Sequence, residues 1–312
     1  MTNQPFLQEV ENDSGLNNLK STQDWLKENK IFIELKLEEH GAIIFKDLPV
    51  KTAEDFDQFV STFNYETFTY EESLSNAVRI NKTDKVFTAN EAPREVEIFL
   101  HHEMAQTPTY PKNIFFFCKS ASETGGETPL CRSDQLYEAL LKADKALVES
   151  FEKFGVIYNS IMSSGDELIS GQGRSWQKTL GVSSKNDAEE KLSKLGYSWN
   201  WIEDDNLSVT TKTLQATKEL GNGQKSFFNQ VIAASLGWKK NSENQIAPVR
   251  FGNGEEIKES YIELISELAQ SLTLLRSWQD RDILLIDNYR VMHGRKPFSG
   301  NKNREVLVSL TN

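Results

Sequence analysis

The segment Leu100-His101-His102-Glu103-Met104 decides how the rest of the chain is interpreted, because it holds two of only four histidines. In an extended strand, residues two apart point to the same face. His101 and Glu103 are therefore predicted to project together, while His102 points the other way. An imidazole and a carboxylate on one face supply two ligands of a metal site, which then needs a third. Because this pattern also occurs at solvated strand ends, the remaining sequence has to distinguish the two.

Composition limits the classes of protein to consider. The 312 residues are 38% hydrophobic and 10% aromatic, enough for a sizeable buried core. A net charge of −11 argues against nucleic acid or an anionic membrane surface as the partner. No basic and apolar leader opens the chain, and no apolar run approaches the ~20 residues of a membrane span, so a cytoplasmic location is expected. Cys118 and Cys131 are predicted to be buried free thiols.

The chain is predicted to form one domain over residues 19–312, after a loose polar arm at 1–18. A helix over about 21–39 is expected to break near Asn29. A second helix is expected after Thr52, which caps it, with Asp55 at the capping-box position. Residues 163–250 are expected to form a mixed insertion. The polar stretch 64–97 is predicted to form the loop that roofs the site, and it offers several candidate contact residues, namely Arg79, Asn81, Thr88 and Asn90.

Short β-branched and aromatic runs recur over the whole chain and predict strands, whereas helices concentrate near the N-terminus and in the insertion. This distribution favours a sandwich or barrel core over a doubly wound sheet. The last histidine, His293, follows a predicted buried strand at 283–287 and is the candidate third ligand. Arg304 opens the final strand, and an arginine that faces a β-core needs an anionic partner, for which a small dicarboxylate is suited.

Four motifs follow one another in the chain: His101-His102-Glu103, Gly125-Gly126-Glu127-Thr128-Pro129, Asp287-Asn288 with His293-Gly294-Arg295, and Arg304. In this order they resemble the taurine dioxygenase/clavaminate synthase-like branch of the Fe(II)/2-oxoglutarate oxygenases. The strings at 101–106 and 171–179 are similar, more narrowly, to plant clavaminate-synthase-like proteins and to bacterial hydroxylases from peptide-antibiotic pathways. The similarity extends over about residues 41–310.

The resemblance implies an α+β protein with a double-stranded β-helix (jelly-roll) core, flanking helices and iron at one open end. It implies that His101, Glu103 and His293 are the iron ligands. Thr128 and Arg304 match the residues that hold the far carboxylate of 2-oxoglutarate. Glu103 stands where a halogenating member would have a small residue, so halogenation is disfavoured.

The resemblance further implies hydroxylation of an unactivated C–H of a small amino-acid-like substrate, with Fe(II), 2-oxoglutarate and O2 required and succinate and CO2 released. The substrate is either free or tethered to a carrier protein, and desaturation, cyclisation or epimerisation could use the same site. A homo-oligomer is compatible with the sequence. The candidate substrate contacts are Asn90, Arg174, Trp176 and Asn229.

Two other classes of protein share the three ligands. A jelly-roll metal hydrolase or isomerase would use them without 2-oxoglutarate, but it would not require the carboxylate clamp that Thr128 and Arg304 imply. A cupin-like sensor would bind metal and ligand without turnover, and the sequence alone leaves that alternative open.

Overall fold

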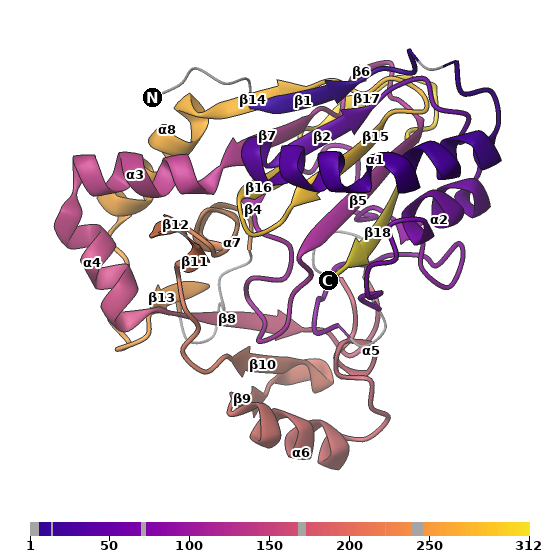
Figure 1. Cartoon of the computed structure of the whole chain (residues 1–312). Helices are drawn as coiled ribbons and strands as arrows, with labels where there is room; N and C mark the ends of the chain where they lie inside the picture. The colour runs from indigo at the N-terminus through magenta and orange to yellow at the C-terminus, as the bar shows by residue number, and fades with distance from the viewer. Residues whose placement is uncertain (1–5, 14, 70–72, 168–172, 222, 239–245) are drawn as a thin grey trace.

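The structure, a computed structural model, has two facing β-sheets at its centre and helices around them, so the chain is α+β as expected (Figure 1). It describes residues 6–13, 15–69, 73–167, 173–221, 223–238 and 246–312. Among the helices in these segments, none is both long enough and apolar enough to cross a bilayer. Cys118 and Cys131 are buried and unpaired, as predicted.

The larger sheet carries the hydrophobic centre of the fold. Its strands, in spatial order, are β1 (Leu7–Val10), β2 (Ala42–Phe45), β15 (Ile283–Asp287), β5 (Asn113–Ser120), β18 (Glu305–Thr311) and β3 (Phe87–Thr88). All neighbours are antiparallel except β1 and β2. Every residue of β2 and β15 is buried, because both faces of the sheet are covered, and this explains their continuous apolar sequences.

The smaller sheet packs against one face of the larger one and carries the site. Its strands, in spatial order, are β14 (Thr273–Arg276), β7 (Thr128–Arg132), β16 (Val291–Arg295) and β4 (Ile98–His101). One hydrophobic cluster joins the sheets, with Leu130 and Val291 from the smaller sheet packed among Ile44, Ile114 and Leu284 of the larger. This packing holds β4 and β16 rigidly at the edge where the site lies.

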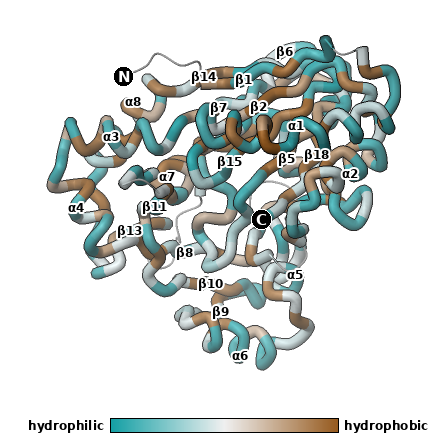
Figure 2. Tube along the Cα trace, in the orientation of Figure 1, coloured by the Kyte–Doolittle hydropathy of each residue, from teal (hydrophilic) through white to brown (hydrophobic). Residues whose placement is uncertain are grey.

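Helices α1 (Leu19–His40) and α2 (Ala53–Ser61) cover the outer face of the larger sheet (Figure 1). Leu26 and Ile33 of α1 join Phe56 of α2 in one cluster with inward-facing residues of β2, β5 and β15. The trace of α1 alternates between hydrophobic and hydrophilic segments in Figure 2, as expected of a helix with one buried side.

A third sheet lies beyond the edge of the smaller one and forms the far wall of the site. Its strands, in order, are β13 (Val249–Phe251), β8 (Val156–Met162), β10 (Leu207–Thr210) and β9 (Ser198–Trp201). Strands β10 and β13 belong to the expected insertion but flank β8, which precedes it, so this segment is joined to the rest of the domain by strand pairing.

The remaining elements surround these sheets. The helices are α3 (Ser133–Ala143), α4 (Lys145–Phe154), α5 (Trp176–Leu180), α6 (Lys185–Leu195), the 3-10 helix η1 (Glu203–Asp205), α7 (Val231–Gly237) and α8 (Glu259–Ser271). Two short pairs complete the fold: β6 (Thr124–Gly125) with β17 (Phe298–Ser299), and β11 (Lys218–Gly221) with β12 (Gln224–Ser226).

Two expectations at the N-terminus were wrong. Residues 7–10 are not part of a loose arm: they form β1, with Leu7 opposite Ala42 in β2. A four-residue edge strand with polar side chains has too weak a pattern to be recognised in sequence. Helix α1 also does not break near Asn29, whose Nδ2 donates to the carbonyl of Trp25 at 2.8 Å one turn earlier.

The N-terminus of α2 provides a test of the fold. Thr52 accepts from the N–H of Asp55 at 3.1 Å, and Asp55 accepts from the N–H of Thr52 at 3.1 Å, which is the capping box that the sequence predicted. Thr52→Ala is expected to lower the free energy of unfolding by about 1 kcal/mol. Urea unfolding monitored by circular dichroism measures this, with the exposed Thr109→Ala as the control. Equal midpoints for the two variants would refute the role of the cap.

Candidate metal centre

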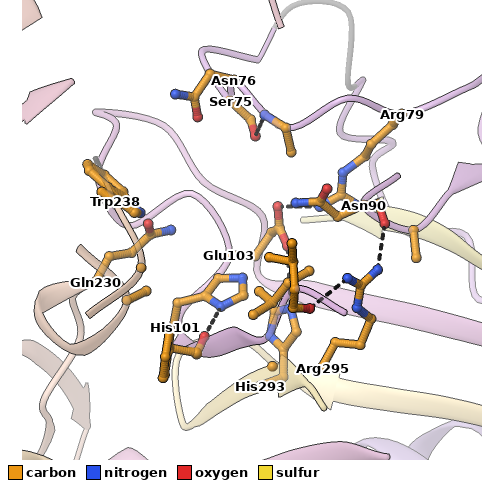
Figure 3. Close-up of a pocket in the computed structure, with 18 of the residues that line it drawn as sticks. Ser75, Asn76, Arg79, Asn90, His101, Glu103, Gln230, Trp238, His293 and Arg295 are labelled. Atoms are coloured by element: carbon orange, nitrogen blue, oxygen red, sulfur yellow. Dashed lines mark hydrogen bonds and ion pairs between the residues drawn. The ribbon is translucent and has the colours of Figure 1, made fainter. Parts of the chain in front are cut away.

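Three side chains from separate parts of the chain converge at the edge of the smaller sheet (Figure 3). Ligand atoms of His101, Glu103 and His293 all lie within 4.8 Å of one another. Nε2 of His293 is 3.5 Å from Oε2 of Glu103, and the ring centroids of His101 and His293 are 4.4 Å apart. Two imidazoles and a carboxylate at this spacing form the donor set of a first-row transition metal with nitrogen and oxygen ligands.

Strand pairing brings the two histidines together. His101 ends β4, and β16 is paired with β4 so that His293 lies directly opposite His101. Glu103 lies beyond the end of β4, in a turn where Met104 has a φ of 59°. The prediction that His101 and Glu103 share one side was therefore correct, but strand alternation is only part of the reason, since the turn also positions the carboxylate.

Asn288 holds the backbone of Glu103 in place. Its Oδ1 accepts from the N–H of Glu103 at 2.8 Å, and its Nδ2 donates to the carbonyl of Glu103 at 3.1 Å. The same Nδ2 donates to the carbonyl of Pro111 at 2.8 Å, and the side chain is completely buried. Asn288 belongs to the Asp-Asn motif before His293, so one turn connects the two ligand-bearing segments. The sequence pattern around Asn288 did not reveal this role.

His102 points away from the other three side chains, as predicted. Its Nδ1 lies against the carbonyl oxygen of Asn288, and its ring packs 4.5 Å from that of Phe228. Burial lowers the pKa of His102 to about 3, which keeps the ring neutral. His102 therefore connects the ligand turn to the core.

The surroundings keep His101 and Glu103 in the forms that bind a cation. Burial and the neighbouring His293 lower the pKa of His101 to about 4. The carbonyl of Phe99 lies 2.8 Å from Nδ1 of His101, so Nδ1 carries the proton and Nε2 is left to bind a metal. Burial alone would raise the pKa of Glu103, but the Arg79 guanidinium and the His293 ring hold it well below its usual range.

One unpaired polar atom shows that the residues fit a metal. Oε2 of Glu103 is buried and has no hydrogen-bond partner, although burial of a lone carboxylate oxygen is costly. Its other oxygen, Oε1, accepts from Nη2 of Arg79 at 2.8 Å. A cation between Oε2 and the two imidazoles would satisfy the unpaired oxygen.

The metal centre lies in a cavity of about 300 Å³, and Thr128 and Arg304 line the same cavity. Burial lowers the pKa of Arg304, and its Nε is buried without a hydrogen-bond partner. Thr128 Oγ1 accepts from Nε1 of Trp278 at 2.9 Å, which leaves the hydroxyl proton to be donated elsewhere. A cation and a hydroxyl donor at one end of the cavity suit a carboxylate.

The Gly-Gly motif makes room for this arginine. Nη2 of Arg304 donates to the carbonyl of Gly126 at 3.3 Å. Gly126 has a φ of 73°, and a Cβ there would come within 3.0 Å of Nε of Arg304. Glycine allows the backbone to approach another group closely, and here that group is Arg304.

Arg295 fixes the loop that roofs the cavity, a role that the sequence did not reveal. Its guanidinium donates to four backbone carbonyls of this loop, those of Asn90, Ala92, Pro93 and Val96, at 2.7 to 3.3 Å. Asn90 lines the cavity next to it, as expected of a candidate substrate contact (Figure 3). The expectation that the polar stretch 64–97 covers the site is therefore met at residues 75–79 and 89–97.

The other three candidate substrate contacts are not among the described residues that line the cavity. Trp176 is buried in the small core beneath α6, and its Nε1 donates to the carbonyl of Asp205 at 3.2 Å. Asn229 donates to the carbonyl of Ala216 at 2.9 Å. Arg174 binds the carbonyls of Ser73 and Ser75, each at 3.2 Å, and so supports a lining segment from behind. Residues 171 and 172 of the quoted segment lie outside the described residues.

Comparison with known proteins identifies the family. The family model described as taurine catabolism dioxygenase TauD, TfdA family, matches residues 7–310. The chain belongs to the TauD/TfdA family. It is therefore an Fe(II)- and 2-oxoglutarate-dependent dioxygenase, as the order of its motifs predicted.

Two relatives are similar to this chain over most of its length. A clavaminate synthase-like protein of Arabidopsis thaliana is 32% identical over 286 residues, covering 91% of this chain and 86% of the relative. The dapdiamide synthesis protein DdaC of Enterobacter agglomerans is 28% identical over 289 residues, covering 88% and 83%.

Two solved structures are similar to this chain in fold. AAD-2 in complex with Mn(II) and N-oxalylglycine has a TM-score of 0.52 at 14% identity, covering 91% of this chain and 87% of that one. A taurine dioxygenase from Burkholderia xenovorans has a TM-score of 0.53 at 12% identity, covering 91% and 80%.

Asn288→Ala tests the clamp on Glu103. The substitution removes both side-chain hydrogen bonds to the Glu103 backbone, and loss of a residue that orients a ligand weakens metal binding about 10- to 100-fold. Calorimetric titration of the apo-protein with Mn(II) measures the affinity, at a temperature where circular dichroism shows the variant folded. Asn200→Ala, at an exposed position, is the control. An affinity equal to that of the wild type would show that the turn holds Glu103 without Asn288.

Proposed function

We propose that His101, Glu103 and His293 hold the iron of this dioxygenase. The observation that carries the proposal is the buried cluster itself, in which Oε2 of Glu103 has no partner and faces Nε2 of His293 at 3.5 Å. Three protein ligands on one side of an octahedral ion leave the remaining positions for co-substrate and oxygen. No other group of three or more His, Cys, Asp or Glu side chains in the described residues has a comparable spacing.

Arg304 and Thr128 bind the far carboxylate of 2-oxoglutarate in this proposal. The unpaired Nε of Arg304 and the hydroxyl proton of Thr128 provide donors in the wall of the cavity. Phe298 packs against the guanidinium at 5.2 Å and keeps it in place. A buried arginine with a spare donor is stabilised by a dicarboxylate far more than by a neutral ligand.

Bound iron and 2-oxoglutarate supply the oxidising chemistry, in which the co-substrate is decarboxylated to succinate. The protein positions the reactants and limits the access of water. Phe116, Val306 and Met104 line the cavity around the ligands, and the ring of Phe116 lies 5.3 Å from that of His293. These apolar groups shield the metal side of the cavity, and the polar groups lie farther out.

We further propose that the two central sheets form a double-stranded β-helix. The facing antiparallel sheets, the cluster between them and the position of the ligands at one edge support this topology. The similarity in fold to the taurine dioxygenase structure supports it as well.

The substrate we propose is a small amino-acid-like molecule, free or tethered to a carrier protein, that is hydroxylated at an unactivated carbon. The outer cavity is lined by Ser75, Asn76, Asn90 and Gln230, with the ring of Trp238 beside Gln230 (Figure 3). Neutral amide and hydroxyl groups beside an aromatic ring suit the amide and amine groups of such a molecule. The relative DdaC, named for dapdiamide synthesis, agrees with this class. Desaturation, cyclisation or epimerisation is the alternative outcome of the same oxidation.

Two measurements test the proposed function. Anaerobic addition of Fe(II) and 2-oxoglutarate to the apo-protein is expected to give a visible charge-transfer band, and air is then expected to yield succinate. A panel of amino acids, amino-acid amides and carrier-tethered amino acids should contain a compound that raises the rate of succinate formation and gains one oxygen by mass spectrometry. Absence of the band in the wild type would refute the assignment, and stimulation only by compounds lacking amine and amide groups would refute the substrate class.

Arg304→Gln tests the co-substrate site. Removal of one partner of a buried charge pair costs at least about 2 kcal/mol, so the dissociation constant of 2-oxoglutarate is expected to rise at least about 30-fold. Titration of the charge-transfer band measures it, and Mn(II) affinity should stay unchanged. Lys302→Gln removes a nearby surface cation that pairs with Asp280 at 2.8 Å and serves as the control. If both variants bind 2-oxoglutarate as the wild type does, Arg304 does not hold the co-substrate.

A further inference from the structure

Arg79 forms a buried ion pair with the carboxylate that we assign as an iron ligand. Its Nη2 lies 2.8 Å from Oε1 of Glu103, and only 6% of the Arg79 side chain and 4% of the Glu103 side chain are exposed. Arg79 approaches from the roof of the cavity, on the side of Glu103 away from the two histidines (Figure 3). The guanidinium therefore contacts the ligand residue itself.

The segment around Arg79 is anchored to the larger sheet. The N–H of Thr88 donates to the carbonyl of Ile80 at 2.9 Å, and the hydroxyl of Thr88 accepts from the N–H of Ile80 at 3.0 Å. Thr88 ends β3, which pairs with β18, and the Arg79 guanidinium packs 5.3 Å above the ring of Phe87 in the same strand. Arg79 thus belongs to a rigid part of the site and is not carried on a free loop.

The ion pair makes the two oxygens of Glu103 unequal. Oε1 is occupied by Arg79, whereas Oε2 faces His293 and has no partner. We propose that Arg79 is a positioning residue that keeps Glu103 a one-oxygen ligand, with Oε2 on the metal and Oε1 on the guanidinium. This inference rests on the proposed role of Glu103 as an iron ligand.

The difference affects how many positions of the metal stay open. A carboxylate can bind a metal through one oxygen or through both. With one oxygen, two histidines and Glu103 occupy three positions of an octahedral ion, 2-oxoglutarate takes two, and one stays open. If Glu103 bound through both oxygens, that last position would be closed. Arg79 competes for Oε1 and so preserves the position that oxygen needs.

Arg79 also compensates the charge of Glu103 before a metal binds. A buried carboxylate that loses the arginine paired with it is strongly destabilised. Replacing Arg79 by an apolar residue is therefore expected to lower the melting temperature of the apo-protein, and added metal should restore most of it. Metal affinity should not fall, because a cation near the metal has been removed and a second oxygen has become available to it.

The test counts water molecules on the metal in Arg79→Met, with Arg79→Lys as the conservative variant. Arg94→Met is the matched control, since Arg94 is an exposed arginine of the same roof segment. Nε of Arg94 lies 3.7 Å from Oε1 of Glu95. Each protein is loaded with Mn(II) and 2-oxoglutarate without oxygen, and broadening of the Mn(II) electron paramagnetic resonance lines by 17O-labelled water reports bound water. The wild type, Arg79→Lys and Arg94→Met should show the broadening, and Arg79→Met should lose it while it binds Mn(II) at least as tightly.

The possible results separate the two proposals. If the wild type binds Mn(II) only weakly, or if its Mn(II) form does not bind 2-oxoglutarate, the proposed function fails before Arg79 is tested. If the wild type behaves as expected and Arg79→Met keeps its bound water, Arg79 does not control the binding mode of Glu103. That second result would overturn the inference. It is also the result expected if Arg79 instead binds a carboxylate of the substrate. Loss of Mn(II) affinity in parallel with stability, with water retained, would show a purely structural role and would also overturn it.

Discussion

A carboxylate buried at the edge of a β-sheet is the constraint around which this site is built. Glu103 is 3% exposed, and an isolated charge at that depth would be driven to its neutral form. Its charge is retained because Arg79 binds one oxygen and the two imidazoles face the other. Asn288 holds the backbone at the same residue. Arg79 and Asn288 satisfy Oε1 and the backbone of Glu103, whereas Oε2 has no hydrogen-bond partner and is left for a cation.

The parts of the site that the sequence predicted are those with local patterns. His101 and Glu103 are two residues apart, and His293 follows a strongly apolar strand, so both segments could be recognised and then linked through the order of the motifs. The capping box at Thr52 is equally local. By contrast, Arg79 meets Glu103 across 24 positions and Asn288 meets it across 185, and no periodicity in the sequence reports such a distance. The short edge strand β1 was missed for a related reason, because its pairing with β2 depends on a partner more than 30 residues away.

Three arginines line the cavity and have three different roles, which the residue type alone does not distinguish. Arg295 is bound to four backbone carbonyls and shapes the roof, and Arg79 is paired with Glu103. Arg304 donates from Nη2 to the carbonyl of Gly126 at 3.3 Å and has no carboxylate partner among the described residues. All three arginines have a buried Nε without a hydrogen-bond partner, so the partners of the other guanidinium nitrogens distinguish them. By that criterion Arg304 is the arginine whose charge is left for an anionic co-substrate.

Membership of the TauD/TfdA family does not by itself identify the substrate, because the two ends of the cavity are built differently. The ligand end of the cavity comes from paired strands, where a shift of one residue would turn His101 or His293 to the other face. The outer end comes from segments at 75–79, 89–99 and 230–238, which strand register does not constrain in this way. A sulfonate such as that of taurine needs a cation at the outer end. Among the described residues that line the cavity, the arginines bind Glu103 and backbone carbonyls or, in the case of Arg304, are assigned to the co-substrate. The rest of the polar lining consists of amides, hydroxyls and the carboxylates of Glu97 and Glu167, which argues against an anionic group at that end, even though the chain is similar in fold to a taurine dioxygenase.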